Sequence, residues 1–507
     1  MAFEPIFETM TPASLQRLCT HQTVVEARLL STGGALISKV LSIATDCTVT
    51  PSEVFAGEAR FSGRASFKVI FTCSEGKNHS MDYHADFTDK LLNEKISAGL
   101  KPILRCSVLD TDTISADERE IKLACVVEVS LDAVMVVPKN ALTRGGDMIY
   151  TNEEELEYAV LAGESKAAVT VSDSSSDMRF TNILLSEARV VVSNRRVGLD
   201  SVVLEGNVIC DLTCEDEEGM IVSHRRVVPF LEEVACLGAR EGDFAVVFAA
   251  VQSHAVSVER DEGSMAVTTE FMLNVDAKVF RTEKAMVVTD AFSVTHELNK
   301  GNEEVVLHHN KFAGSFSDRV EGSVTLDVSM PIADNLLAVT GARLNIANAQ
   351  AQDGKILYEG IVTGNILYYS AEINLKSSVA VELPFSILVN NEIAKEGDSV
   401  LVNGIVSSMT AKLVRGNEIQ IKSEIEVEMV LAASCKRMVL TGLELGEERI
   451  LPTSAFSVHI AKNGESLWDV AKALGLTPEL VLVQNPGLSL PLNGGERVMA
   501  YRQKMGV

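Results

Sequence analysis

The chain has 507 residues, of which 46 % are apolar and 23 % charged, and its formal net charge is −25. This length accommodates several domains of about 100–200 residues each, and the composition is that of folded rather than disordered proteins. The acidic excess excludes a protein held to nucleic acid by its charge, because such binding depends on Lys and Arg contacts with phosphates. Residues 455–507 carry five Lys or Arg against four Asp or Glu, so the acidic excess lies in the rest of the chain.

The N-terminal sequence and the cysteines predict the compartment. Met-Ala-Phe-Glu-Pro has neither the basic start nor the apolar run of a signal peptide. No stretch approaches the roughly 18 apolar residues of a membrane helix. The nine cysteines are odd in number and scattered, as expected of reduced core thiols. We therefore expect a cytoplasmic protein with no signal peptide, no transmembrane segment and no direct membrane insertion.

The first predicted element is a short helix near the N-terminus. Thr11 has the character of a helix cap, and Pro12 suits the first helical position. Residues 1–34 are therefore expected to form an N-terminal segment that contains this helix.

Three landmarks then recur in the same order along the chain. The first is a glycine among strand-like residues, the second a phenylalanine 24 or 25 residues later, and the third a glycine 12 residues beyond that. The three sets are Gly63, Phe87 and Gly99; Gly206, Phe230 and Gly242; and Gly360, Phe385 and Gly397. The spacing of 143 to 154 residues between copies is too long for a solenoid repeat and indicates tandem domains.

Each copy ends in a run of alternating apolar and polar residues, at 121–133, 267–279 and 419–431. A period of two over this length predicts a long strand with one buried face. Shorter β-rich runs separated by turn-like residues precede each of them, which is typical of a sandwich or a curved antiparallel sheet. The predicted fold class is therefore mainly β.

The repeats define the expected domain organisation. Three tandem, sandwich-like antiparallel domains are expected at residues 35–140, 178–290 and 331–440. The polar stretches 141–177, 291–330 and 441–454 are expected to connect them and the C-terminal region.

The repeats resemble a known family. The residues that carry the resemblance are the Val-Leu-Glu-Gly and Leu-Tyr-Glu-Gly strands, the Pro-Phe pairs at 229–230 and 384–385, and the Glu-Gly-Asp turns. Together they resemble the SPOCS domain of sporulation proteins from spore-forming Firmicutes, over roughly residues 35–440. The first copy departs most, because Ala85-Asp86-Phe87 replaces the Pro-Phe pair.

Residues 456–501 predict a small α+β unit. Phe456–Ile460 alternates like a strand, Ser466 suits the cap of a first helix, and Thr477 with Pro478 suits the start of a second. Arg497–Tyr501 supplies a closing strand. The predicted order is strand, helix, helix, strand (βααβ).

This unit, at 455–503, resembles a LysM domain through the string Gly-Glu-Ser-Leu-Trp-Asp-Val-Ala at 464–471. The resemblance implies binding of N-acetylglucosamine polymers in a shallow groove formed by two loops. Carried over by position, the groove residues are Asn463, Gly464, Glu465, Ser466, Leu467, Gln484, Pro486, Gly487, Leu488 and Ser489. The alternative for Gly464, Ser466 and Asn485 is that they are turn and cap residues that build the fold, and Trp468 is expected in the core.

We found no pattern of a catalytic nucleophile or phosphate-binding loop. His79 and His84 with Asp82 between them are interpreted as surface polar residues, and Cys210 and Cys214 as core thiols. No enzyme activity, catalytic residue, metal site or cofactor is therefore expected.

Tandem SPOCS-like domains followed by a LysM-like domain resemble the SipL-type spore coat morphogenesis proteins. The resemblance implies a non-enzymatic scaffold or adaptor in spore coat assembly, in the mother-cell cytosol at the forespore surface. It implies a coat morphogenetic partner of the basal-layer ATPase type, with the LysM-like domain as targeting or docking head. The alternative is a peptidoglycan-binding protein of the cell wall or spore cortex, which needs an export route.

Overall fold

The structure is a computed structural model that describes residues 3–31, 35–176, 178–261, 264–415, 417–450, 455–492 and 494–501. It is mainly β, with two short helices in the described part of the chain. The prediction of a mainly β protein is therefore confirmed. None of the helices in the described residues is long and apolar enough to cross a membrane.

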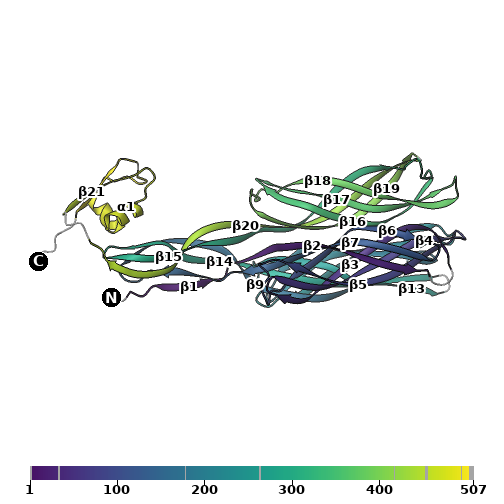
Figure 1. Cartoon of the computed structure of the whole chain (residues 1–507), viewed down its shortest axis with the longest axis horizontal. Coiled ribbons are helices and arrows are strands. Elements are labelled where there is room, and N and C mark those ends of the chain that lie inside the picture. The colour runs from purple at the N-terminus through teal and green to yellow at the C-terminus, as the bar shows by residue number, and fades with distance from the viewer. Residues whose placement is uncertain are drawn as a thin grey trace.

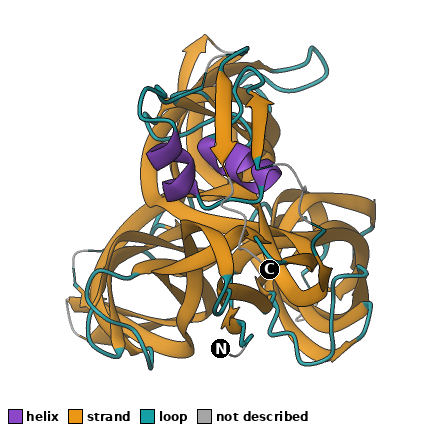
Figure 2. Ribbon diagram, turned by 90° about the vertical axis from the view of Figure 1, so that its left-hand side faces the viewer, coloured by secondary structure: helices purple, strands orange, loops and turns teal. Residues whose placement is uncertain are grey.

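Six three-stranded antiparallel sheets pack in pairs to form three lobes, which are grouped around the long axis of the molecule (Figures 1 and 2). Lobe 1 consists of β2 (Ala13–Leu30), β7 (Glu120–Val136) and β6 (Ile103–Ala116) against β3 (Ile37–Phe55), β4 (Glu58–Cys73) and β5 (Asn78–Leu92). Lobe 2 consists of β10 (Asn182–Val197), β11 (Ser201–Glu215) and β12 (Ile221–Ala235) against β13 (Phe244–Asp261), β14 (Ser264–Ser293) and β9 (Ile149–Ser175). Lobe 3 consists of β16 (Asn335–Gln352), β17 (Lys355–Ser370) and β18 (Leu375–Asn390) against β15 (His296–Thr325), β20 (Glu418–Glu448) and β19 (Ser399–Arg415).

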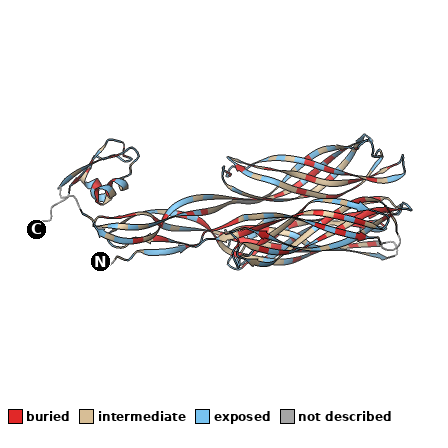
Figure 3. Cartoon of the chain, in the orientation of Figure 1, coloured by how far each residue is buried: buried red, intermediate tan, exposed pale blue. Residues whose placement is uncertain are grey.

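The three alternating runs lie in β7, β14 and β20, which are the central strands of their sheets. In β7 the apolar set from Ile121 to Ala133 is fully buried, and in β20 Ile419, Ile421 and Ile425 are as well. A pleated strand directs alternate side chains to opposite faces. The apolar residues of each alternating run therefore share one face and supply the core between the two sheets of their lobe (Figure 3).

The recurring glycines and phenylalanines are cross-strand neighbours. Gly206 pairs directly with Phe230, and Gly360 with Phe385, as Gly63 does with Phe87. The aromatic ring covers the glycine opposite, where a Cβ atom would meet it within 2.9 Å in all three lobes. The second glycine of each set has a φ of 85° to 91°, a left-handed conformation that favours glycine.

The lobes contact one another directly. One buried apolar cluster draws on all three, with Leu41 from lobe 1, Leu185 from lobe 2 and Leu367 from lobe 3 among its members. The hydroxyls of Ser42 and Thr340 lie 2.7 Å apart across the contact of lobes 1 and 3. The three repeats therefore form one body, and do not lie one after another as a row of spacers.

A stalk projects from this body (Figure 1). We define it as β1 (Ile6–Met10), β8 (Lys139–Arg144) and the ends of β9, β14, β15 and β20 at residues 149–160, 283–293, 296–309 and 433–448. It consists of three two-stranded ribbons, β1 with β8, β9 with β14 and β15 with β20. All three ribbons contribute to a buried apolar cluster that includes Met10, Leu156, Val287 and Val439. A second buried cluster of the stalk includes Leu142, Val288 and Leu440.

Two sequence predictions are wrong at this level. The N-terminal segment 1–34 has no helix in its described part: residues 13–30 form β2, which pairs with β7 along its whole length. The stretches 141–177, 291–330 and 441–454, expected as connections, instead consist largely of β9, β15 and the end of β20, while residues 177 and 451–454 lie outside the described residues. Long-range strand pairing outweighs the local cap and charge patterns in both cases.

Candidate docking module at the tip of the stalk

The C-terminal module, residues 455–501, is a small unit of its own. It contains β21 (Phe456–Ile460), α1 (Leu467–Leu474), α2 (Pro478–Gln484) and β22 (Arg497–Tyr501). The two strands pair antiparallel, and Val470, Ala471, Val481, Val498 and Ala500 form the centre of its core.

Local capping explains why the two helices form. Ser466 is the N-cap of α1: its hydroxyl accepts a hydrogen bond from the Asp469 amide at 3.1 Å, and the Asp469 carboxylate accepts one from the Ser466 amide at 3.0 Å. The Ser466 hydroxyl also donates a hydrogen bond to the Asp469 carboxylate at 2.6 Å, and this bond, together with that from the Ser466 amide, lowers the pKa of Asp469. Gly475 ends the helix with a φ of 62°, and Thr477 caps α2 through the Leu480 amide.

Several residues of the first predicted groove loop have structural roles within the module. The Glu465 carboxylate lies 2.9 Å from His459 Nε2 and accepts a hydrogen bond from the Lys462 amide, and these contacts lower the pKa of Glu465. Gly464 has a φ of 79°, and Leu467 packs against the module core. Asn463 is exposed.

The second predicted groove loop likewise contains both residues with structural contacts and exposed residues. The Gln484 side-chain amide binds both the amide and the carbonyl of Tyr501, each at 2.8 Å. Leu488 packs against the module core. Pro486, Gly487 and Ser489 are exposed. Six of the ten groove candidates are thus exposed, although Ser466 among them also caps α1: Asn463, Gly464, Ser466, Pro486, Gly487 and Ser489.

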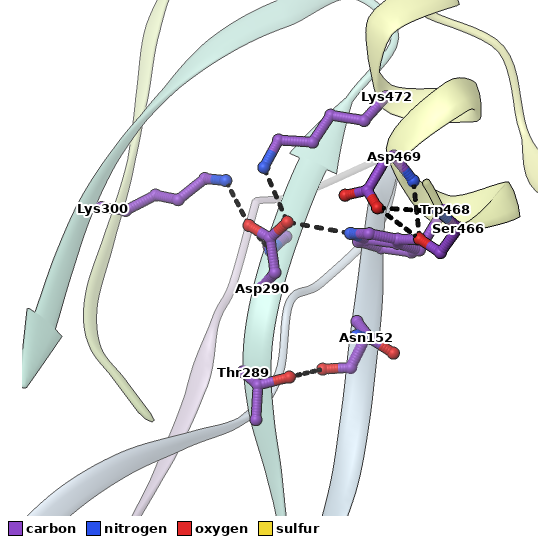
Figure 4. Close-up of polar contacts among 9 residues, drawn as sticks. Asn152, Thr289, Asp290, Lys300, Ser466, Trp468, Asp469 and Lys472 are labelled. Carbon is purple, nitrogen blue, oxygen red and sulfur yellow. Dashed lines mark hydrogen bonds and ion pairs between the residues drawn. The ribbon is translucent and has the colours of Figure 1, made fainter. Parts of the chain in front are cut away.

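Trp468 lies between the module and the stalk. Its indole Nε1 donates a hydrogen bond to Asp290 Oδ2 at 2.8 Å (Figure 4). Its ring meets that of Phe292 edge-on, with centroids 4.9 Å apart. Phe292 is 3 % exposed, belongs to the core of the module and stacks on Tyr150 of β9. The tip of the stalk therefore completes the hydrophobic core of the module.

Asp290 is the polar centre of this contact. Besides Trp468, it accepts hydrogen bonds from Lys300 of β15 and Lys472 of α1, both at 2.6 Å (Figure 4). Burial disfavours the charged carboxylate, but the three donors outweigh it and lower the pKa of Asp290 to about 2. The Asp290 side chain thus links strands β14 and β15 of the stalk to helix α1 of the module.

We expect Asp290 to make the seating of the module dependent on pH. Because its pKa is lower in the folded than in the unfolded chain, its stabilising contribution is complete above about pH 4 and is lost as the pH falls towards 2. For a carboxylate about a quarter exposed, we expect a contribution of about 1–2 kcal/mol. Trp468 is the only tryptophan, so its emission measured from pH 6 downwards reports the transition. Asp290→Asn should remove this step, and an unchanged titration in that variant would contradict the assignment.

The sequence did not reveal Asp290, Phe292 or Tyr150 as site residues. Each lies in a β-strand far along the chain from the module, and only Phe292 offered a signal, as a large apolar residue beyond the alternating run of β14.

The histidines and cysteines that the sequence offered for metal binding or catalysis do not come together in one site. His79 and His84 are five residues apart on β5, so they face opposite sides of the strand: His79 stacks on Phe71 and His84 contacts the Ser66 hydroxyl. Burial raises the pKa of the Cys210 and Cys214 thiols to about 12, which makes them poor nucleophiles. Within the described residues there is no cluster of three or more His, Cys, Asp or Glu suited to a metal ion.

Fold and site together define a three-lobed β protein that carries a small α+β module on a stalk. Residues 334–414 match a protein-family model described as SipL, SPOCS domain. The matched segment runs from β16 to β19 in lobe 3. The match supports a SipL-like family and a sporulation-related role. Comparisons with curated proteins and with solved structures gave no match.

Proposed function

We propose that this chain is a non-enzymatic scaffold in spore envelope assembly, in which the C-terminal module, a LysM-like domain, serves as the docking head. The three lobes are SPOCS-like domains, and the protein acts in the mother-cell cytosol at the forespore surface. Its partner is a coat morphogenetic protein of the basal-layer ATPase type.

The observation that carries the proposal is the position of the module. It is seated on the end of the stalk through Trp468, Asp290 and Phe292, away from the lobes (Figure 1). The stalk has buried apolar clusters and paired strands, so it fixes where the module points. A rigid support with one exposed head suits a protein that connects two layers of an assembly.

Removal of residues 455–507 tests the role of the head. We expect the shortened protein to keep its lobes, because their cores do not draw on the module, and to become diffuse in the mother cell. Fluorescence microscopy of tagged proteins measures localisation, and circular dichroism of the purified variant checks that the β body is retained. Forespore localisation of a folded, shortened protein would contradict the proposal.

A second candidate is binding of N-acetylglucosamine polymers. It is favoured by the exposed residues Asn463, Pro486, Gly487 and Ser489 on the two predicted groove loops. Sedimentation of the full chain with insoluble peptidoglycan tests it. Saturable binding that N-acetylglucosamine oligomers compete away, and that Asn463→Ala with Ser489→Ala weakens, would favour this function over protein docking.

A further inference from the structure

Strand β21 has an open edge. The amide of Ala461 donates to Glu496 O and its carbonyl accepts from the Gly495 amide, both at 2.8 Å, so Ala461 faces β22. Backbone groups alternate along a strand, so those of Phe456, Val458 and Ile460 point away from β22. Among the described residues none forms a backbone hydrogen bond with the outward groups of these three.

The other edge of this two-stranded sheet is closed. The Asn485 side chain accepts a hydrogen bond from the Met499 amide at 2.7 Å and donates to the Met499 carbonyl at 2.8 Å. Gln484 binds both backbone groups of Tyr501 in the same manner. Side chains from the end of α2 therefore occupy the outward hydrogen-bonding groups of β22, which leaves β21 as the edge to which a strand can add.

The open edge lies beside an exposed apolar face. Phe456 pairs with Tyr501 and Val458 with Met499, and all four side chains are about half exposed, as is that of Ile460 (48–63 %). Unpaired backbone groups beside exposed apolar side chains favour the addition of another strand.

We propose that β21 pairs with β21 of a second copy of this chain, antiparallel and about a twofold axis. The pairing places Val458 opposite Val458, and Phe456 of one copy opposite Ile460 of the other. The contact is isologous, so it closes as a dimer. It also joins the two-stranded sheets of the two copies into one four-stranded sheet, in which their apolar faces are continuous.

Charge favours a contact between copies at this strand rather than between the lobes. β21 carries no Asp, Glu, Lys or Arg, and residues 455–507 are near neutral, whereas the rest of each chain holds the acidic excess. Two acidic bodies repel each other. Because β21 lies at the far end of the molecule from the lobes, a tip-to-tip contact keeps those bodies apart (Figure 1).

Sedimentation velocity of the full chain tests the proposal. The contact is small, so we expect a monomer–dimer equilibrium in the range of about 10–100 μM. Val458→Pro removes the outward amide while sparing the bonds to β22, and it should weaken the dimer at least about tenfold. Val483→Lys is the matched control, because Val483 is 75 % exposed in the same module but lies on α2; it should leave the dimer intact. A chain that stays monomeric across this range, or a dimer that Val458→Pro leaves unchanged while Trp468 emission shows a folded module, would overturn the proposal.

Cross-linking tests the register. Directly opposed residues of a hydrogen-bonded pair have Cα atoms about 5.5 Å apart, within the range of a disulfide. Val458→Cys should therefore form, with mild oxidant, an intermolecular disulfide between the introduced cysteines of the two copies. Peptide mass spectrometry identifies this bond, because the chain has nine other cysteines. Val483→Cys should not form one. Equal yields at the two positions would overturn the pairing.

Discussion

Replacement of Gly206 by alanine is expected to destabilise lobe 2 by about 3 kcal/mol. A Cβ atom at this position would lie 2.1 Å from the backbone oxygen of Val191 and 2.8 Å from the ring of Phe230. The ring can rotate, but Val191 belongs to β10 and is held by its pairing with β11, so the strands must separate. Chemical denaturation followed by circular dichroism should show an earlier transition for the variant.

Gly63 provides the comparison that separates the two contacts. There the nearest atoms to an added Cβ all belong to the ring of Phe87, at 2.3 to 2.8 Å. Gly63→Ala combined with Phe87→Ala should therefore recover part of the stability lost in Gly63→Ala alone. The corresponding pair Gly206→Ala with Phe230→Ala should recover none, because the Val191 oxygen remains. Recovery in both lobes would show that the backbone contact has no effect.

The sequence was sufficient for the parts of the fold that depend on local or periodic patterns. Alternation identified the central strands β7, β14 and β20, because each buries one face within its own lobe. The capping residues Ser466 and Thr477 identified both helices of the module, since a cap acts within a few residues of itself. The fixed distance between Gly206 and Phe230 likewise reflects a pairing within one sheet.

Features that depend on distant segments could not be predicted. The polar stretch 141–177, which includes Glu153, Glu154 and Glu155, was expected as a connection. These glutamates instead lie on β9, which pairs with β14 and contributes Leu156 and Tyr158 to a buried cluster of the stalk. Strand pairing of this kind offsets the low strand preference of glutamate. The grouping of the lobes about one axis had no sequence signal, since it rests on contacts such as that between Ser42 and Thr340, 298 residues apart.

The same limit applies to the site. The groove residues were assigned by position in a family pattern, and Glu465, Ser466 and Gln484 prove to have structural partners within the module. Trp468 was expected in the core, and it does contact the module core, but its polar partner is Asp290 on the stalk. A partly buried indole favours an acceptor, and here the acceptor comes from a segment 178 residues away.

Phe292→Ala is expected to release the module from the stalk. Phe292 is buried between Tyr150 and Trp468, so the substitution leaves a cavity where two segments meet and should cost about 3–4 kcal/mol. That loss exceeds the contribution expected of Asp290, so the ion pairs alone should not hold the module in place. The lobes have separate cores and should unfold as before. Trp468 should then lose its aromatic neighbour and its acceptor together, and its emission should shift to longer wavelength at neutral pH.

Phe456→Ala is the matched control for this shift, because Phe456 lies in the same module and is 53 % exposed, and its removal leaves no cavity. Phe292→Leu should lie between the two, since it retains most of the volume but not the ring contacts. An emission spectrum that is the same in Phe292→Ala and Phe456→Ala would mean that the module is not seated on the stalk. The fixed direction of the proposed docking head would then have no structural basis. A shift confined to Phe292→Ala, smaller in Phe292→Leu, would tie that direction to a single aromatic contact at the end of three paired ribbons.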